Sequence, residues 1–277
     1  MNKKDKELVD LHLHTNASDG TWDIKETIAR VIEKNIKYFS ITDHDTFENS
    51  LKALKCIPRN RRFILGSEIS STYKGKEYHI LAYGFNPENK ELNELIQHNQ
   101  LVREKYNDDL IDYVKEYEVV NNISDYENYA WDLKRGGWKS LNYLIDKGVV
   151  NDLSSYFELV GISKLTLEFM SPAAVIEKIH QAGGLCILAH PSAYGENLMK
   201  QNFLKVWLSF GIDGVECYSP YLENIDDAGY YVQFCEENHL MISGGSDCHG
   251  KFNDRAIGIP RVAWGDTTLE RIFYDQK

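Results

Sequence analysis

Asp10-Leu11-His12-Leu13-His14-Thr15 is the stretch of this 277-residue sequence that decides the fold. Leucines alternate with histidines in it, and strand side chains alternate between two faces, so the pattern predicts a short strand. His12 and His14 would then share one face, where two imidazoles can chelate one divalent cation. A His-x-His pair also arises by chance, so a metal site here depends on further ligands elsewhere in the sequence.

The composition is that of a globular protein with a sizeable core. The sequence is 43% hydrophobic, and no run approaches the roughly 18 apolar residues of a transmembrane helix, so no membrane partner is expected. Its 31 basic and 42 acidic residues give a net charge of −11, which disfavours a basic groove for long nucleic acid. A short anionic substrate is still compatible, because bound cations reverse the local charge.

Cysteine usage and the first residues bear on the compartment. The five cysteines include no Cys-x-x-Cys pair, which argues against a disulfide framework or a zinc knuckle and favours a reducing environment. Residues 1–7 are charged and lack the apolar core of a secretory signal. We therefore expect a cytoplasmic protein, and the sequence leaves its oligomeric state open.

Predicted strands and helices alternate on both sides of a long helical stretch. After the first strand, strands are predicted at residues 38–42, 62–69, 78–84, 185–189, 214–218 and 240–243. Helices are predicted at residues 23–34, 48–56, 172–182, 198–210 and 224–239. This alternation predicts an α/β protein, built as a parallel barrel or as an open doubly wound sheet.

The middle of the chain has a different pattern. Between residues 92 and 114, hydrophobic residues recur at three- and four-residue steps, which predicts a long amphipathic helix. Shorter helical pieces are predicted at residues 125–134, 138–147 and 151–160. We interpret residues 88–160 as a helical subdomain inserted into one barrel domain, which comprises residues 1–87 and 161–277.

Potential metal ligands stand at or just after the ends of the predicted strands. They are His44, Glu68, His190, Glu216, Asp247 and His249. The carboxyl ends of barrel strands converge on one face, where active sites are built. The inventory of possible ligands is too large for one cation and suits two or three metals that share a bridging carboxylate. It comprises the imidazoles of His12, His14, His44, His79, His190 and His249 and the carboxylates of Asp19, Glu68 and Asp247.

Seven short stretches that contain these residues resemble, in the same order along the chain, the motifs of the PHP (polymerase and histidinol phosphatase) family. The matching stretches are residues 12–15, 18–20, 41–46, 66–68, 79, 189–191 and 245–250. The chain is most similar to the bacterial PHP phosphoesterases that act on nucleoside 3′,5′-bisphosphates and on the 5′ ends of short RNA. The resemblance implies a distorted (β/α)7 TIM-like barrel with a trinuclear metal site and an inserted helical region.

The resemblance also implies a ligand set for each metal. One ion is expected on His12, His14, Glu68 and Asp247; a second on Glu68, His79 and His190; a third on Asp19, His44 and His249. Imidazole and carboxylate ligands without thiolate fit Zn²⁺, Mn²⁺ or Fe²⁺. Asp43, Asp45 and Glu216 are candidates to orient the ligands; the alternative is that they cap helices or make core hydrogen bonds.

Such a cluster suits the hydrolysis of phosphate esters. A carboxylate-bridged metal cluster lowers the pKa of bound water and supplies a hydroxide for in-line attack on phosphorus. We therefore expect a metal-dependent phosphatase or phosphodiesterase acting on a small phosphorylated substrate, such as a nucleoside bisphosphate or a short 5′-phosphorylated oligonucleotide. Two alternatives stay open: an amidohydrolase-like attack on a carbonyl, and a non-catalytic PHP binding module.

Basic and aromatic residues outside the motifs are candidates for binding the substrate. They are Lys134, Arg135, Trp138, Lys139 and Arg255. Cations beside aromatic rings can anchor a remote phosphate and stack a base. The alternative interpretation of these residues is an ordinary solvated surface.

Overall fold

The computed structural model describes residues 6–117, 125–194 and 200–274. Within these ranges, eight strands form one mixed sheet in the order β7-β6-β5-β4-β3-β2-β1-β8. The strands are β1 (Leu8–Asp10), β2 (Ile36–Ile41), β3 (Arg62–Tyr73), β4 (Lys76–Tyr83), β5 (Leu185–Leu188), β6 (Gly214–Tyr218), β7 (Met241–Gly244) and β8 (Val262–Ala263).

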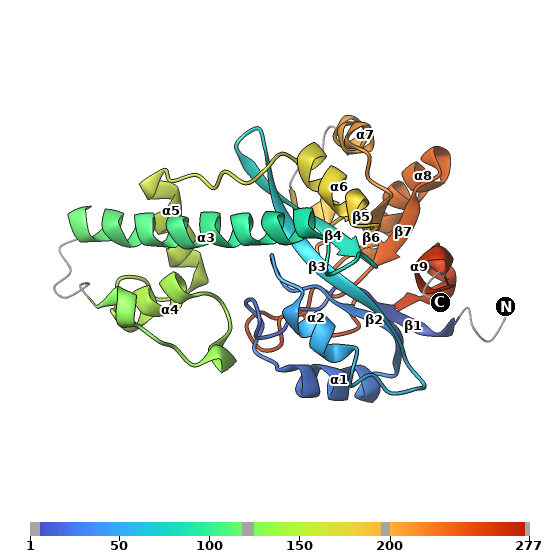
Figure 1. The fold of residues 1–277 in the computed structure, drawn as a ribbon, viewed down its shortest axis with the longest axis horizontal. Helices are drawn as coiled ribbons and strands as arrows, with labels where there is room; N and C mark the ends of the chain where they lie inside the picture. The colour runs from blue at the N-terminus through green and yellow to red at the C-terminus, as the bar shows by residue number, and fades with distance from the viewer. Residues whose placement is uncertain (1–5, 118–124, 195–199, 275–277) are drawn as a thin grey trace.

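The sheet curls until its far strands nearly meet (Figure 1). Just after β1, the amide of Leu11 donates to the carbonyl oxygen of Gly244 at the end of β7, at 3.2 Å. Leu13 forms a further parallel bridge with Cys248. These contacts join β7, at one end of the strand order, to the segment after β1, which lies next to the other end. The sheet is therefore a nearly closed barrel, and the quoted first stretch completes it.

The strand directions are only partly those predicted. β1, β2 and β3 are parallel, as are β5, β6 and β7, but β4 is antiparallel to both of its neighbours. The expectation of a uniformly parallel sheet is therefore wrong at β4. Only Lys74 and Gly75 separate β3 from β4, both with positive φ (50° and 74°). Such a two-residue turn reverses the chain in a hairpin, whereas a parallel crossover needs a dozen residues or more.

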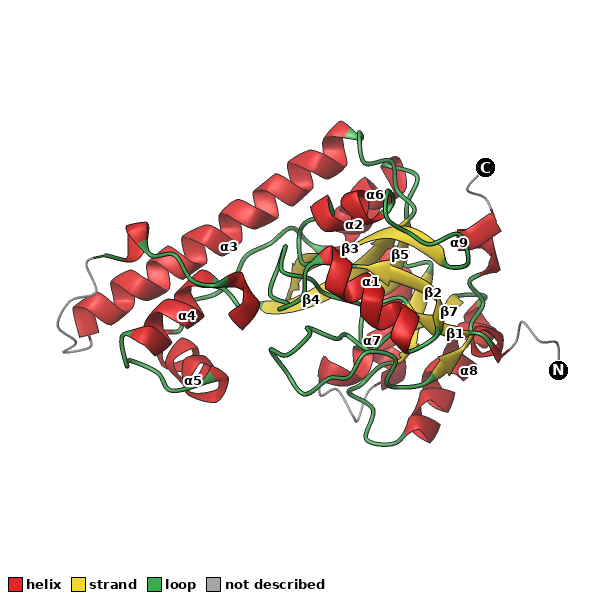
Figure 2. Ribbon diagram, turned by 90° about the horizontal axis from the view of Figure 1, so that it is seen from below, coloured by secondary structure: helices red, strands yellow, loops and turns green. Residues whose placement is uncertain are grey.

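Helices cover the outside of the barrel (Figure 2). They are α1 (Ile24–Glu33), α2 (Glu48–Ala53), α6 (Pro172–Gln181), α7 (Lys200–Phe210), α8 (Ala228–Asn238) and α9 (Glu270–Tyr274). Side-chain caps fix two of their starts: Asp23 accepts from the Glu26 amide, and Ser171 accepts from the Ala174 amide with Pro172 in the first turn. Short 3₁₀ turns connect other elements: η4 (Pro191–Tyr194), η5 (Ile225–Asp227) and η6 (Trp264–Asp266).

Apolar side chains fill one end of the barrel interior. Leu11, Leu81, Tyr83 and Ile187 are fully buried in one cluster, although β1 and β4 are not neighbours in the sheet. The Tyr83 hydroxyl donates to the Leu11 carbonyl oxygen at 2.7 Å, which satisfies its buried polar group. Burial of each such side chain stabilises the fold by roughly 1.5–3 kcal/mol. This packed floor leaves the other end of the barrel for polar side chains.

A separate group of helices lies to one side of the barrel (Figure 1). It contains α3 (Lys90–Tyr117), α4 (Lys139–Asp146) and α5 (Leu153–Ser163), and the predicted helix at 125–134 is instead two 3₁₀ turns, η2 (Tyr126–Asn128) and η3 (Leu133–Arg135). The first half of α3 packs into the barrel's outer core, and its second half packs against α4 and α5 in another core. Among the described residues, no helix is both long and apolar enough to cross a membrane.

Candidate metal centre

The structure brings all nine predicted ligands together at the polar end of the barrel. Three carboxylates stand among six imidazoles, and every imidazole lies within 4 Å of at least one carboxylate. The nine residues are His12, His14, Asp19, His44, Glu68, His79, His190, Asp247 and His249. Six of them, from both ends of the chain, are 4% exposed or less, namely His12, His14, Glu68, His190, Asp247 and His249.

The first group lies between the quoted stretch and two carboxylates. His12 Nε2 is 3.1 Å from Glu68 Oε2 and 3.3 Å from Asp247 Oδ1. His14 Nε2 is 3.2 Å and 3.1 Å from the same two oxygens. All four atoms lie within 4.8 Å of one another. This foursome is the set that the sequence resemblance implies for one ion.

Glu68 extends the cluster in a second direction. Its Oε1 is 3.1 Å from His79 Nδ1 and 2.9 Å from His190 Nε2, and its Oε2 is 3.2 Å from His44 Nδ1. One fully buried carboxylate therefore contacts five imidazoles. Glu68, His79 and His44 form a compact group, and His190 approaches the same oxygen as His79. Glu68 is placed as a bridge between two groups of nitrogens.

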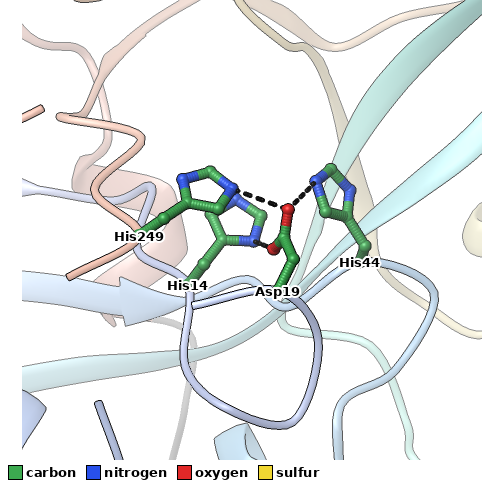
Figure 3. Close-up of side chains that lie close together, drawn as sticks. All are labelled: His14, Asp19, His44 and His249. Atoms are coloured by element: carbon green, nitrogen blue, oxygen red, sulfur yellow. Dashed lines mark ion pairs between the residues drawn. The ribbon is translucent and has the colours of Figure 1, made fainter. Parts of the chain in front are cut away.

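Asp19 holds the third group (Figure 3). Its Oδ2 is 3.2 Å from His249 Nε2 and 3.8 Å from His44 Nε2, and its Oδ1 is 3.6 Å from His14 Nδ1. His14 and His44 also belong to the other groups, so the three groups form one continuous cluster rather than separate sites.

The backbone is strained where it delivers two of these ligands. His190 and Asp247 have φ values of 28° and 47°, in the left-handed region that residues other than glycine seldom adopt. His190 lies just after the end of β5, and Asp247 lies just after the end of β7. Such conformations cost on the order of 1–3 kcal/mol each and are retained where a site requires a specific direction of the side chain.

Burial and neighbouring charges shift the pKa values of the clustered side chains. Burial alone would raise the pKa of Asp19, but the neighbouring His249 and His44 hold the pKa of this carboxyl far below its usual range. Burial also lowers the pKa of a histidine, yet nearby carboxylates raise the pKa of His14 and of His79 to about 10. For His44, burial dominates and lowers its pKa to about 3. In the absence of cations, protons on His14 and His79 would balance the buried carboxylates.

Several buried atoms of the cluster have no hydrogen-bond partner and are placed where a cation could bind them. His44 Nδ1, Glu68 Oε2, His79 Nδ1 and His190 Nδ1 are buried without a hydrogen-bond partner. Two ligand atoms on one cation at roughly 2.1 Å each lie roughly 3–3.5 Å apart, which is close to the 3.1–3.3 Å spacings around Glu68 and Asp247. The donor set of imidazoles and carboxylates therefore suits divalent transition metals.

The three predicted supporting carboxylates have different roles. Glu216 Oε1 lies 3.0 Å from His12 Nδ1, and Glu216 Oε2 accepts from the His190 amide at 2.7 Å. Asp43 accepts from the Thr15 amide and hydroxyl and from the Ser18 hydroxyl, which braces the turn before Asp19. Of the three, Glu216 is thus the one that contacts an imidazole ring of the cluster.

Asp45, the remaining supporting candidate, acts on the backbone behind Glu68. It accepts from the Ser70 amide at 3.0 Å and from the Asn99 side chain at 2.7 Å. Since Asn99 lies on α3, this contact ties the long helix to the strand that carries Glu68.

Glu77 and Tyr221 contact the cluster and are among the residues that sequence reasoning missed. Glu77 Oε1 lies 3.0 Å from His79 Nε2, and the Tyr221 hydroxyl donates to Asp247 Oδ2 at 2.9 Å. A signal existed for Glu77, because it precedes His79 by two residues and strand residues two apart share a face. Tyr221 lies in an irregular segment after β6, where no periodic pattern places a side chain.

The predicted substrate-binding residues lie in two places. Arg255 contacts the cluster: its Nη1 forms a short ion pair with Asp247 Oδ2, and its guanidinium carbon lies 4.3 Å from the centre of the Tyr221 ring. Arg135 instead pairs with Asp146 at 2.9 Å, and Lys139 Nζ donates to the Glu127 carbonyl oxygen at 3.2 Å. Two further candidates belong to the helical group: Lys134 is exposed, and Trp138 packs on Phe252 and Tyr156.

One loop of the helical group nevertheless reaches the cluster. The Gly137 amide donates to the Asp19 carbonyl oxygen at 2.7 Å. A Cβ on Gly136 would come within 2.8 Å of the same oxygen and 2.7 Å of Phe252. Gly136 and Gly137 thus let the helical group close against the turn that carries Asp19.

Known proteins of similar sequence are phosphate-ester hydrolases by name. The chain is 27% identical over 250 residues to a 5′-3′ exoribonuclease of Haemophilus influenzae, covering 87% of this chain and 89% of that protein. It is 23% identical to the phosphoribosyl 1,2-cyclic phosphate 1,2-diphosphodiesterase of Eggerthella lenta, covering 88% and 94%. It is 24% identical to the 3′,5′-nucleoside bisphosphate phosphatase of Chromobacterium violaceum, covering 87% of each.

The fold and the family agree with these similarities. A crystal structure from Bifidobacterium adolescentis, described as a metal-dependent phosphoesterase, superposes with a TM-score of 0.75 at 21% identity, covering 91% of each chain. The PHP domain model matches residues 10–167, a range that contains six of the nine clustered residues. The resemblance seen in the sequence motifs is therefore confirmed, and this chain belongs to the PHP family.

Proposed function

We propose that this PHP protein is a metal-dependent phosphoesterase that acts on a small phosphorylated substrate. The observation that carries the proposal is the cluster itself, in which two buried carboxylates, the partly buried Asp19 and six imidazoles converge at one end of the barrel. The named relatives, whose substrates are all phosphate esters, support the same chemistry.

Two or three divalent cations, Zn²⁺, Mn²⁺ or Fe²⁺, are proposed for this cluster. His12, His14, Glu68 and Asp247 would hold one; Glu68 with His79 and either His44 or His190 a second; Asp19, His44 and His249 a third. Such cations neutralise phosphate oxygens and lower the pKa of a coordinated water near phosphorus.

The protein's own side chains prepare this centre before substrate arrives. Glu216 fixes the orientation of the His12 ring through Nδ1 and holds the backbone of His190. This leaves His12 Nε2 directed at the carboxylates. Asp43 holds the turn before Asp19 through three hydrogen bonds. The ligands are therefore positioned by the fold, and cations need not gather them.

Arg255 is proposed as the substrate's phosphate contact. Its guanidinium is confined between the Tyr221 ring and Asp247 and is 27% exposed at the side chain. A planar, permanently charged group fixed beside the centre is suited to a phosphate, which guanidinium binds through paired hydrogen bonds. Roles for Lys134, Arg135, Trp138 and Lys139 in binding a more distant part of the substrate stay predictions.

The division of the chain is also proposed rather than established. Residues 1–87 and 161–277 would form a (β/α)7-type barrel domain, with residues 88–160 inserted as a helical subdomain. The separate core of α3, α4 and α5 supports this division. A reducing, cytoplasmic location is proposed from the five cysteines, all of which are free thiols.

The substrate class is best resolved by a hydrolysis screen that measures inorganic phosphate, the product of a phosphatase, and nucleotides, the products of a phosphodiesterase acting on RNA. Protein reconstituted with Mn²⁺ is compared on nucleoside 3′,5′-bisphosphates, short 5′-phosphorylated RNA, cyclic ribose phosphates and mononucleotides, with the metal-free protein as control. We expect metal-dependent release from at least one of the first three. Amides and lactones are included in the same screen, and their turnover without hydrolysis of any phosphate ester would favour the amidohydrolase-like alternative. No turnover of any substrate by metal-loaded protein would favour a binding module.

A further inference from the structure

Arg103 brings a positive charge from helix α3 to the edge of the metal centre. Its Nη1 donates to Glu77 Oε2 on β4 at 3.3 Å, and its Nη2 makes a shorter contact with Glu77 Oε1. Nη2 also donates to Ser70 Oγ at 3.1 Å, and the guanidinium carbon lies 4.8 Å from the centre of the Phe169 ring. Arg103 is therefore fixed on three sides.

Glu77, the partner of Arg103, also contacts His79, one of the clustered histidines. Glu77 Oε1 lies 3.0 Å from His79 Nε2, and the other ring nitrogen, Nδ1, lies 3.1 Å from Glu68 Oε1. When a cation displaces the Nδ1 proton, Glu77 would hold the remaining proton on Nε2, and the lone pair of Nδ1 would face the cation beside Glu68. His79 Nδ1 is buried and has no hydrogen-bond partner, which is the state expected of a nitrogen that awaits a cation.

We propose that Arg103 and Glu77 are positioning residues that orient His79 for the cation held between Glu68 and His79. This inference rests on the proposed metal centre. It adds that helix α3, although it belongs largely to the helical group, sets the affinity of one metal position.

Two ion pairs within α3 differ from this one. Lys105 pairs with Asp109 and Lys115 with Asp112, four and three residues apart on the same exposed helix face. Pairs of that kind contribute little to stability. The pair of Arg103 and Glu77 instead joins α3 to β4, with side chains 34% and 25% exposed. Removing one member of a half-buried pair leaves the other charge without its partner.

Burial and charge agree with the role of Arg103. Burial would raise the pKa of Glu77, but the Arg103 guanidinium and His79 hold the pKa of this carboxyl well below its usual range. Glu77 Oε1, at 3.0 Å, is placed to accept the proton of His79 Nε2. Arg103 also counters the attraction between an ionised Glu77 and a cation, which keeps the carboxylate on Nε2 of the ring.

Titration of the full-length, metal-free protein with Mn²⁺ tests the inference, with bound metal counted by equilibrium dialysis and elemental analysis. Glu77→Gln is nearly isosteric and should weaken one Mn²⁺ equivalent by about 10–100-fold, the usual effect of losing a partner of a metal-bound histidine. Arg103→Met should weaken the same equivalent by less, and Arg103→Lys should recover part of that loss. The double variant should be no weaker than Glu77→Gln.

Lys178→Met is the matched control, because it breaks another ion pair of α3, with Glu91 at 3.0 Å, on the outer surface of the barrel. It should leave all Mn²⁺ equivalents unchanged. Wild-type Mn²⁺ affinities in both Glu77→Gln and Arg103→Met, or equal weakening of every equivalent, would overturn the positioning role alone. A wild-type protein that binds no Mn²⁺ would overturn the metal centre and this inference together.

Discussion

The barrel's strand ends and the helical group differ in how their charged side chains are buried and paired. At the strand ends, carboxylates and imidazoles from distant segments are buried against one another, as with Glu68 and His12 at 3.1 Å. In the helical group, charged side chains such as Arg135 and Asp146, which lie 2.9 Å apart, are exposed and pair within the group. Buried charges are costly unless they are paired or bind a metal. The difference teaches that the strand ends carry the chemistry, while the helical group affects it through a few defined contacts.

The largest effect is expected from removing a ligand. His12→Ala should abolish binding of one metal ion and lower kcat/KM for the phosphate substrate by about a thousandfold or more, since metal ions contribute several kcal/mol of transition-state stabilisation. Elemental analysis and phosphate release measure the two effects. His98→Ala, at an exposed position on α3, is the control and should change neither. Equal behaviour of the two variants would remove the distinction between the two regions.

The pH dependence of metal binding should be steep. Burial lowers the pKa of His14 and of His79, but neighbouring carboxylates outweigh it and raise both pKa values to about 10 in the metal-free chain. A protonated imidazole cannot bind a cation, so Mn²⁺ must displace these protons. Affinity should therefore increase as pH rises toward 10, roughly tenfold per pH unit for each displaced proton. Dissociation constants measured at pH 6.5, 7.5 and 8.5 test this, and a flat profile would contradict it.

Substrate binding separates the basic residues of the two regions. Arg255→Gln removes a charge-assisted contact to phosphate, usually worth roughly 1.5–3 kcal/mol, and should raise KM by about 10–100-fold. Changing Lys134, Arg135 and Lys139 together to Gln should raise KM by less than about threefold, since Arg135 and Lys139 bind neighbours within the helical group. The account would be reversed if the triple variant had the larger KM. Metal content is measured alongside, because Arg255 also contacts Asp247.

The smallest effect concerns the loop that joins the regions. Gly136→Ala should lower the free energy of unfolding by roughly 1–3 kcal/mol, because the new Cβ would clash with Phe252 and the Asp19 carbonyl. Gly148 has the same φ of 70° with nothing within 4 Å of an added Cβ. Gly148→Ala therefore reports backbone strain alone, roughly 1 kcal/mol. Urea unfolding measures the free energy of unfolding of both variants. If Gly136→Ala and Gly148→Ala lost the same amount, the close approach of Gly136 to Phe252 and Asp19 would not limit stability.

The sequence predicted which side chains cluster, because most of them are tied to a local signal. His44, Glu68 and His190 follow hydrophobic runs that are recognisable as strands, and strands of one barrel deliver their ends to a common face. Helix starts were equally local, as the cap of Ser171 before Pro172 shows. Short-range patterns therefore sufficed for the alternation of elements.

What could not be predicted depends on long-range pairing. The reversed direction of β4 follows from its hairpin with β3, and the hydrophobic run of β4 looks the same in either direction. Arg103 lies 26 residues from its partner Glu77, and nothing in its surrounding helical pattern distinguishes it from Lys105, an exposed neighbour. Only the packing of α3 onto the barrel reveals which of the two side chains reaches the centre.

The central claim is that the clustered strand ends form a metal centre. Its most direct test is the number of metal ions bound per chain after the metal-free protein is reconstituted with Mn²⁺, Fe²⁺ or Zn²⁺ and dialysed. The account predicts two or three equivalents, with phosphate release restored in proportion. A folded protein that retains no metal with any of the three would contradict it.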